Sequence, residues 1–243
     1  MDLTHVLYSI LAGVIPACLW LWFWLREDNL RPEPRSIIVR AFIGGMLAVI
    51  VVIPLQFAAQ EFVKDQKSLF IIWAFIEEII KLLAAYFFAL RTRYADEPID
   101  DVIYLITTAL GFAAIENTFY VFGVLSRGDV IGSIVTGNLR FIGATLVHVV
   151  ASAIIGYAAA RTFYRSPMVR TAFITCSIFI AGGLHAIFNL NIMSANSADK
   201  LKIFGVVWAC TIIIMFLFEK IKRITYKHER FSTHPQGTSA SVR

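Results

Sequence analysis

The chain has 243 residues, of which 58% are hydrophobic and only 16% are charged, and its mean hydropathy is +0.71. About one quarter of the residues in a soluble globular domain are charged, so this composition excludes an ordinary soluble protein and predicts an integral membrane protein. The formal net charge of +5 comes from basic residues that flank apolar runs. That placement indicates anchoring in the lipid bilayer, and nucleic acid is not an expected partner.

Apolar runs long enough to cross a membrane recur along the whole chain. A bilayer core of about 30 Å is crossed by about 20 helical residues, and we predict an all-α bundle of seven transmembrane helices. In chain order the predicted spans are Thr4–Leu25, Ser36–Ala58, Ser68–Leu90, Asp101–Leu125, Asn138–Ala160, Val169–Met193 and Leu201–Phe218. The Gly- and Ser-containing segment Ser126–Gly137 is expected to be an outer loop.

The predicted helices form one unit, because no Pro-, Gly- or Ser-rich linker divides the chain. We therefore predict a single transmembrane domain over residues 1–226, followed by a polar cytoplasmic tail over residues 227–243 that we expect to be disordered. The three cysteines, Cys18, Cys176 and Cys210, lie within apolar runs and lack the spacing of a metal site. They are expected to be buried packing residues.

The distribution of Lys and Arg residues predicts the orientation of the bundle. Alternate loops, together with the C-terminal end, hold 15 of the 22 Lys and Arg residues, whereas the remaining loops hold six. Basic loops stay in the cytoplasm. We therefore expect a multi-pass protein of the plasma membrane, with its N-terminus outside and its C-terminus inside.

Four of the predicted spans carry polar residues at positions where lipid-compatible residues are expected. A charged residue at the centre of a membrane helix costs about 2.5–3.5 kcal/mol on insertion scales, and such residues usually face the protein interior and mark function. These residues are Glu77, Glu78 and Lys81 in the third span, Glu116 and Asn117 in the fourth, His148 and Ser152 in the fifth, and His185 and Asn189 in the sixth.

The predicted topology brings these residues to a common depth. Glu77, Glu116, His148 and His185 each lie about 12–15 Å from the expected outer end of their spans, at 1.5 Å per residue. Two of these spans run inward and two run outward, yet all four residues fall in one layer in the outer half of the bilayer. Residues four apart, such as His148 and Ser152, share a helix face. Each helix can therefore direct one polar stripe toward the interior.

Each polar feature by itself has a simpler structural interpretation. Glu77 and Lys81 could be a buried ion pair that fixes helix register. A single His148 or His185 would more often be an interior residue with a satisfied side chain. The other polar residues could bind neighbouring helices to each other through hydrogen bonds. Their convergence at one depth favours a functional site.

Carboxylates and imidazoles together can activate a water molecule in two ways. Two His residues and one Glu can hold Zn²⁺, which lowers the pKa of its bound water to about 7. Alternatively, one Glu acts as general base while a His polarises the substrate carbonyl. The chain has neither an HExxH nor a GxSxG motif, so zincin and α/β-hydrolase sites have no support.

The same residues carry a resemblance to the PrsW-type intramembrane proteases. Glu77-Glu78-Ile-Ile-Lys81 resembles the EExxK motif of that family, and Phe112-Ala-Ala-Ile-Glu116 matches its FxxxE motif. His148-Val-Val-Ala-Ser152 matches a third motif of HxxxS type, and Gly183-Leu-His185 resembles a polar position on a later helix. The resemblance covers four spans in order, roughly from Ser68 to Asn189.

The resemblance implies an intramembrane endopeptidase. The family is related to the CAAX-processing and bacteriocin-processing membrane proteases, which usually have FxxxH and HxxxN where this chain has Glu116 and Ser152. The role known for PrsW is the first cleavage of a membrane-anchored anti-sigma factor in a stress-signalling cascade. The expected partners are therefore a single-span membrane protein as substrate and the lipid bilayer, with cleavage in or near the outer end of the substrate helix.

On this basis we assign a role to each polar residue. Glu77 is the leading general base or metal-bound carboxylate, with Glu78 beside it. Glu116 and His148 complete the water-activating group, and His185 is a further ligand or polariser, so that the candidate zinc ligands are Glu77, Glu116, His148 and His185. The supporting residues offset negative charge or donate hydrogen bonds to an oxyanion. They are Lys81, Asn117, Ser152 and Asn189.

Two functions of other classes use similar residues. A proton-coupled transporter also contains buried Glu and His residues, but it needs a polar path through both leaflets. The polar residues predicted here lie in the outer half of the bilayer. Deeper in the membrane the spans carry only hydroxyl groups, such as those of Thr107 and Thr108. A non-catalytic scaffold of the same fold, which binds helices without cutting them, is the third alternative.

Overall fold

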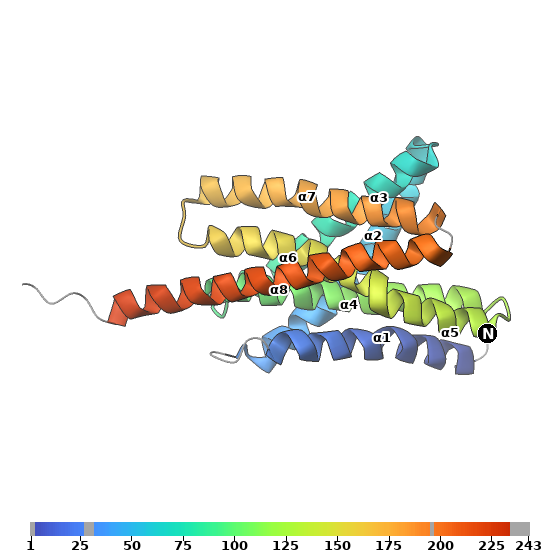
Figure 1. Ribbon diagram of the computed structural model, residues 1–243, viewed down its shortest axis with the longest axis horizontal. Helices are drawn as coiled ribbons and strands as arrows, with labels where there is room; N and C mark the ends of the chain where they lie inside the picture. The colour runs from blue at the N-terminus through green and yellow to red at the C-terminus, as the bar shows by residue number, and fades with distance from the viewer. Residues whose placement is uncertain (1–2, 27–31, 195–196, 234–243) are drawn as a thin grey trace, which may run out of the picture.

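The computed structural model describes residues 3–26, 32–194 and 197–233, and nearly all of them lie in helices (Figure 1). The predicted all-α class is confirmed. The helices are α1 (Leu3–Arg26), α2 (Arg35–Phe62), α3 (Gln66–Ala85), α4 (Pro98–Leu125), α5 (Val130–Leu139), α6 (Thr145–Arg161), α7 (Pro167–Ser194) and α8 (Ser197–Thr233). Two π-helical turns, η1 (Tyr86–Leu90) and η2 (Arg140–Ala144), continue α3 and connect α5 to α6.

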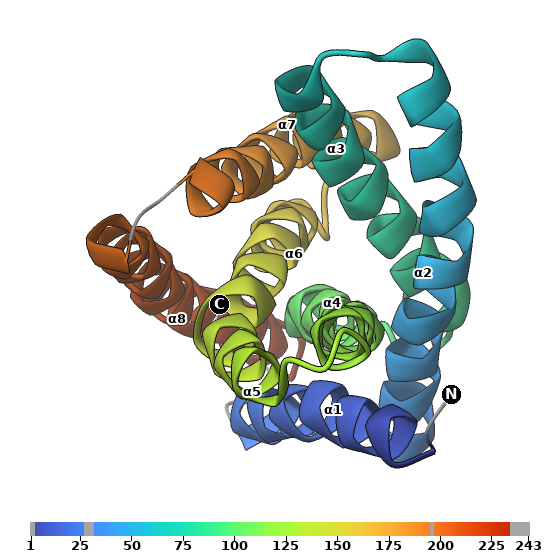
Figure 2. The ribbon, with the colours of Figure 1, turned by 90° about the vertical axis from the view of Figure 1, so that its right-hand side faces the viewer.

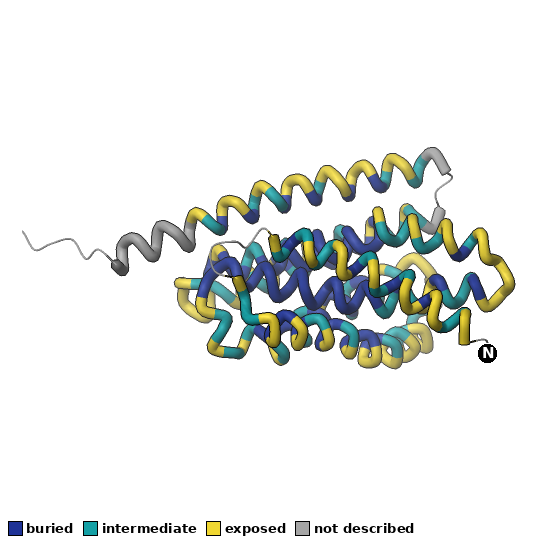
Figure 3. Tube along the Cα trace, turned by 90° about the horizontal axis from the view of Figure 1, so that it is seen from below, coloured by how far each residue is buried: buried dark blue, intermediate teal, exposed yellow. Residues whose placement is uncertain are grey.

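Helix α4 is the centre of the bundle. Every residue from Pro98 to Ala114 is buried, so this stretch is covered on all sides, as expected for a helix that is apolar all round. Seen end-on, α4 is surrounded by α1, α2, α5 and α6 (Figure 2), and the outer helices expose one face each (Figure 3). Helices α3, α4, α6 and α7, which carry the polar motifs, pack against one another.

Six helical segments in the described residues are long and apolar enough to cross a membrane. They are α1, α2, α4, the continuous segment Val130–Arg161, α7 and residues 199–223 of α8. The third predicted span is also helical and consists of α3 and η1. It is not one of the six segments, because it contains the three charged residues Glu77, Glu78 and Lys81. The crossing of the membrane by seven helices therefore remains a prediction.

The start of α3 is fixed by a side-chain cap. The carboxylate of Asp65 accepts hydrogen bonds from the Ser68 backbone N–H at 2.8 Å and from the Ser68 hydroxyl at 2.7 Å. These bonds lower the pKa of Asp65, because they favour its charged form. The cap satisfies an N–H group that has no partner within the helix, and α3 can therefore begin immediately before its apolar run.

The prediction of an outer loop over Ser126–Gly137 is wrong. Helix α5 begins at Val130, and the Asp129 carboxylate caps it by accepting from the Gly132 backbone N–H at 2.7 Å. The Asp side chain and the apolar residues that follow outweigh the weak helix propensity of the glycines. The fifth span is therefore longer than predicted and runs from Val130 to Arg161.

Two other predictions differ from the structure or lie partly outside it. Cys18 and Cys176 are exposed and Cys210 is half-buried, so the prediction that the cysteines are buried is wrong. The apolar runs that hold them belong to outer helices, whose exposed faces suit lipid.

Helix α8 continues to Thr233, past the predicted start of the tail at residue 227. Residues 234–243 of that tail lie outside the described residues.

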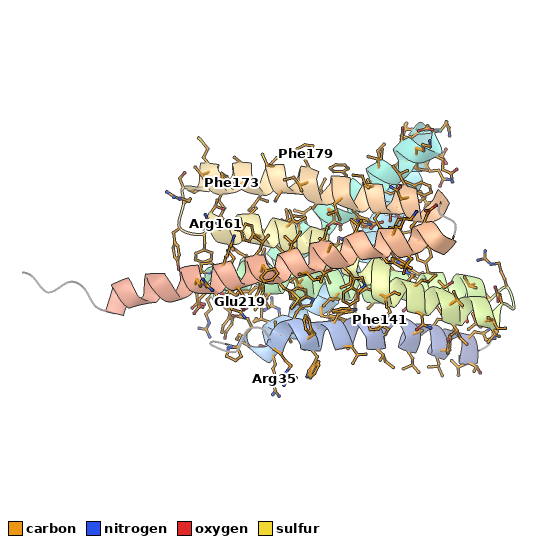
Figure 4. All side chains as sticks on the ribbon, viewed as in Figure 1. Arg35, Phe141, Arg161, Phe173, Phe179 and Glu219 are labelled. Atoms are coloured by element: carbon orange, nitrogen blue, oxygen red, sulfur yellow. The ribbon has the colours of Figure 1, made fainter. Side chains whose placement is uncertain are left out.

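Two arginines of the predicted cytoplasmic set lie in the same part of the bundle. Helix α1 begins at the right-hand end of the view in Figure 1, and α8 ends at the left. Arg35 and Arg161 both lie toward the left-hand end (Figure 4). The orientation of the bundle in the membrane remains a prediction.

Helices α2 and α4 approach closely where Gly111 faces the backbone of α2. A Cβ atom at Gly111 would overlap the carbonyl group of Phe42. Small residues allow membrane helices to pack backbone to backbone, which increases the van der Waals contact between them. Gly111 directly precedes Phe112 and lies five residues before Glu116 on α4, so this contact helps to position the α4 part of the site.

We expect Gly111→Ala to lower the free energy of unfolding by about 1–3 kcal/mol, because the added methyl group forces α2 away from α4. Gly123→Ala on the same helix is the matched control, since its Cβ would meet no atom within 4 Å. The control should be neutral or slightly stabilising, by up to about 1 kcal/mol. Thermal unfolding of the purified proteins in detergent measures both, and equal melting temperatures would contradict the close contact.

Candidate active site

The polar residues of four helices meet around one cavity of about 380 Å³. Glu77, Glu116, His148, His185 and Asn189 line it, as the sequence predicted for residues of a common site. Further polar lining residues, which the sequence analysis did not assign to the site, are Gln56, Tyr120, Arg140 and Lys200. The other lining residues are mostly aromatic or aliphatic. The cavity is therefore apolar with a few convergent polar groups, which is typical of a ligand site.

Glu77 has one bonded and one unbonded carboxylate oxygen. Its Oε1 accepts a hydrogen bond from Gln56 Nε2 at 2.8 Å. Its Oε2 is buried without a hydrogen-bond partner among the described residues, and it lies 3.6 Å from His185 Nε2. A buried carboxylate oxygen without a partner is rare in proteins and calls for a functional explanation. A metal ion or a water molecule would satisfy it.

The second carboxylate of the motif fixes the orientation of His185. The distance from His185 Nδ1 to Glu78 Oε1 is 2.7 Å. An ionised carboxylate only accepts hydrogen bonds, so Nδ1 carries a hydrogen, and in the neutral imidazole Nε2 then presents its lone pair toward Glu77. Histidines that bind metals in proteins typically donate their other N–H to a carboxylate in this way.

Lys81 connects this pair to the second imidazole. Its ammonium group donates to Glu78 Oε1 at 2.5 Å and lies 3.1 Å from His148 Nδ1. Because an ammonium group has no acceptor, His148 Nδ1 accepts and Nε2 carries the hydrogen. His148 Nε2 then donates to Glu116 Oε2 at 2.8 Å. Both nitrogens of His148 are thus engaged in hydrogen bonds, in contrast to those of His185.

The ion pair considered as an alternative for Glu77 and Lys81 is formed instead by Glu78 and Lys81. Both partners of this pair are fully buried, with 0% of each residue exposed. Residues three apart on a helix are neighbours just as residues four apart are, so the spacing alone did not distinguish Glu78 from Glu77. Glu77 therefore faces the cavity, whereas Glu78 is enclosed in the interior of the helical bundle.

Three of the predicted residues form a group that can hold a metal ion. Glu77, His148 and His185 each offer one ligand atom, and these atoms lie within 4.8 Å of one another. Carboxylate oxygen and imidazole nitrogen are common zinc ligands, and catalytic zinc sites use three protein ligands. The unpartnered Oε2 of Glu77 and the free lone pair of His185 fit this use. Glu116 is not part of this group, because its Oε2 is bound by His148 and by Arg140 at 2.5 Å.

The predicted supporting residues differ in their positions. Asn117 is buried and donates to Thr145 Oγ at 2.9 Å, which binds α4 to α6. Ser152 is buried, is absent from the described cavity lining, and has no hydrogen-bond partner there. Asn189 lines the cavity, so it is the one of these three that can reach a molecule bound there.

Two of the four missed polar residues, Gln56 and Arg140, form hydrogen bonds to predicted site residues. Gln56 orients Glu77, and it lies near the end of an otherwise apolar span, where a single amide is a signal that could have been used. Its backbone carbonyl accepts from Trp73 Nε1 at 3.1 Å, which ties α2 to α3. Arg140 was counted only as an outer basic residue, because the segment before it was expected to be a loop.

Comparison with known proteins agrees with the resemblance of the motifs. Residues 33–218 match a family described as "PrsW family intramembrane metalloprotease". A protein named Protease PrsW from Clostridioides difficile (strain 630) is 24% identical over 232 residues, which cover 92% of this chain and 91% of the relative. One from Halalkalibacterium halodurans is 27% identical over 190 residues, covering 75% and 83%.

A third relative has a higher sequence identity over a shorter stretch of the chain. Protease PrsW from Geobacillus kaustophilus (strain HTA426) is 34% identical over 114 residues, which cover 46% of this chain and 51% of the relative. The chain thus spans about half the length of that relative in the alignment. No solved structure matches this one.

We expect Lys81→Met to lower the free energy of unfolding by about 3–5 kcal/mol, because it leaves Glu78 buried without its cation. The double variant Lys81→Met/Glu78→Gln should recover part of this loss. Lys202→Met is a matched control, since Lys202 forms a 2.9 Å pair with Asp199 at the same spacing of three residues but is 80% exposed. The control should change the free energy of unfolding by at most about 1 kcal/mol.

Denaturant unfolding in mixed micelles measures all three proteins. A loss in Lys81→Met no larger than that of the control would show that the buried pair contributes little. A double variant less stable than Lys81→Met would show that Glu78 has a stabilising partner other than Lys81.

Proposed function

Because the chain belongs to the PrsW family of intramembrane metalloproteases, we propose that it is an endopeptidase that hydrolyses a peptide bond of a membrane-anchored protein. The observation that carries this proposal is the buried Oε2 of Glu77, which has no hydrogen-bond partner in the described structure and faces His185 Nε2 at 3.6 Å. This arrangement leaves room for one small ligand between a carboxylate and an imidazole lone pair, at the wall of a cavity.

In the metal-dependent form of the proposal, Glu77, His148 and His185 would hold the ion. A zinc ion bound there would supply a water of lowered pKa, about 7, and a Lewis acid for the scissile carbonyl. The chain's own residues hold the ligands in place: Glu78 keeps a hydrogen on Nδ1 of His185, and Gln56 holds Oε1 of Glu77. His148 would have to release one of its two hydrogen bonds to serve as a ligand, and release of Lys81 would leave the bond from Nε2 to Glu116 in place.

In the metal-free form, Glu77 Oε2 takes the proton from the attacking water. The substrate carbonyl then needs a hydrogen-bond donor. A neutral His185 does not supply it, because its hydrogen is held on Nδ1 by Glu78 and its Nε2 then carries none. The geometry of His185 thus supports its use as a ligand more than its use as a polariser, and the metal-dependent form is the one we favour.

We propose that the cavity opens toward the outer half of the plasma membrane. Support comes from Lys200, which lines the cavity at the start of α8, and from the grouping of Arg35 and Arg161 at the opposite end. An active site at this depth would cut in or near the outer end of a single-span substrate helix. The helix must unwind there, because its own hydrogen bonds hold each carbonyl. A membrane-anchored regulator such as an anti-sigma factor has the required form.

We expect Glu77→Gln to abolish cleavage while leaving the protein folded, since the amide keeps the size of the side chain and removes the charge that binds a metal ion or accepts a proton. Mass spectrometry of terminal peptides compares membrane-protein fragments from cells that express wild type or variant at equal levels. Fragments seen only with wild type, cut near outer helix ends, would support the proposal and name substrates.

The same experiment can contradict the proposal. Equal fragment patterns with both proteins inserted would leave the proton-coupled transporter and the non-catalytic scaffold as the remaining functions. Proton flux into vesicles that contain the purified protein would then identify a transporter. Capture of single-span proteins without cleavage would identify a scaffold.

We expect a strong chelator to remove the activity of the purified protein and Zn²⁺ to restore it. Competition with a chromophoric chelator should show that Glu77→Gln binds Zn²⁺ at least about ten-fold more weakly than wild type, because one of three protein ligands loses its charge. Activity that persists after removal of all bound metal would overturn the metal-dependent form and leave Glu77 as a general base.

A further inference from the structure

The helix that carries His148 contains a π-helical turn one turn before it. In η2 the backbone N–H of Thr145 donates to the carbonyl of Arg140, five residues earlier. On a regular α-helix, two residues eight apart, such as Arg140 and His148, differ by about 80° around the axis at 3.6 residues per turn. A π turn accommodates about one extra residue, which reduces the difference to about 20°. Arg140 and His148 therefore point to the same side.

Both side chains reach the same oxygen atom. Arg140 Nη2 and His148 Nε2 lie 2.5 Å and 2.8 Å from Glu116 Oε2. Arg140 is also held by two neighbours of Glu116 on α4: its Nε donates to Asn117 Oδ1 at 2.5 Å, and its guanidinium carbon lies 3.8 Å from the centre of the Tyr120 ring. A planar guanidinium with three contacts on one helix face has a single defined position.

Two tryptophans from distant helices support the π turn. Trp20 Nε1 on α1 donates to the Phe141 carbonyl at 3.2 Å, and Trp208 Nε1 on α8 donates to the Ile142 carbonyl at 3.1 Å. The two indole rings also contact each other, with centroids 5.9 Å apart. Backbone groups without partners are costly at membrane depth, so donors from side chains stabilise a turn in which the regular pattern of hydrogen bonds changes.

Gly143, within the π turn, packs so closely against α8 that no larger residue fits there. A Cβ atom at Gly143 would overlap the ring of Phe204 on α8. The π turn is thus enclosed by α1, α4 and α8, and it is a specific structural element of the fold. π turns of this kind are frequent at functional sites.

We propose, on the basis of the function proposed above, that Arg140 is a positioning residue of the active site, which acts through Glu116 on His148. Arg140 fixes Glu116 Oε2 as the acceptor for His148 Nε2–H, and this bond sets the ring orientation of His148, whose tautomer the Lys81 ammonium at Nδ1 already determines. The π turn, supported by Trp20 and Trp208, is the element that presents Arg140 to Glu116. Without Arg140, Glu116 would be free to rotate and His148 would lose its fixed acceptor.

The first test is kinetic. With a substrate identified by the fragment comparison, Arg140→Gln should lower kcat by about 10- to 100-fold, the usual effect of removing a group that orients a ligand, with KM changed by less than about two-fold. Arg140→Lys should recover part of kcat, because the ammonium keeps the charge but not the planar contacts. Arg127→Gln is the matched control: this arginine follows α4 at an exposed position, and kcat should not change.

The second test needs no substrate. Nitrogen-15 NMR of histidine-labelled protein reports the hydrogen bonds of the ring nitrogens, and the His148 signals are identified by their loss in His148→Gln. Wild type should show one sharp Nε2–H signal. In Arg140→Gln this signal should move and broaden because Glu116 is no longer held in one position, while Nδ1 stays without a hydrogen because Lys81 is unchanged. Trp208→Phe should shift both kcat and the Nε2–H signal in the same direction, and it should add nothing in an Arg140→Gln background.

These outcomes separate the two proposals. A wild type that cleaves, with Arg140→Gln unchanged in kcat and in the Nε2–H signal of His148, would overturn the role of Arg140 and leave the protease function intact. A wild type that cleaves nothing would contradict the protease function, while the Nε2–H signal of His148 still decides whether Arg140 positions it. Additive effects of Trp208→Phe and Arg140→Gln would overturn the role of the π turn as the element that presents Arg140.

Discussion

The site depends on one buried ammonium group. Lys81 has no exposed surface, yet its Nζ lies within hydrogen-bond distance of Glu78 Oε1 and His148 Nδ1 and 5.3 Å from the centre of the Phe112 ring. A charge at membrane depth must have partners, and these come from α3, α4 and α6. The requirement to satisfy this one cation therefore holds three helices in register around the cavity.

The network divides the acidic residues of the site by their neighbours. Glu78 and Glu116 each bind a cation and a histidine, so they are structural carboxylates that orient imidazoles. Glu77 accepts from an uncharged amide and keeps one oxygen unbound. Glu77 and Glu78 each have a buried oxygen without a hydrogen-bond partner in the described structure, but of these two residues Glu77 is the one that lines the cavity. Its free oxygen can therefore bind a ligand or take up a proton there. Chemically identical carboxylates can therefore have different roles in one site, because their hydrogen-bond partners differ.

Sequence patterns predicted the helical class, six of the apolar spans and the residues around the cavity, because membrane insertion selects for long apolar runs and makes each polar exception conspicuous. They did not distinguish Glu77 from Glu78, since neighbouring residues on a helix differ by only 100° and the packing of α3 decides which one is enclosed. Arg140 was missed for a related reason. A residue's direction depends on the hydrogen-bond pattern of the turns that follow it, and nothing in the composition of residues 140–144 marks a π turn.

The π turn also bears on chain length. The turn η2 contains one residue more than regular helical winding would need. A related chain lacking one residue between Arg140 and Thr145 could form a continuous α-helix of the same hydrophobicity. The counterpart of Arg140 would then lie seven residues before that of His148 and about 20° from it around the axis, so the residues before the turn would keep their direction. What such a chain would lose is the turn itself, with the carbonyl groups that Trp20 and Trp208 bind.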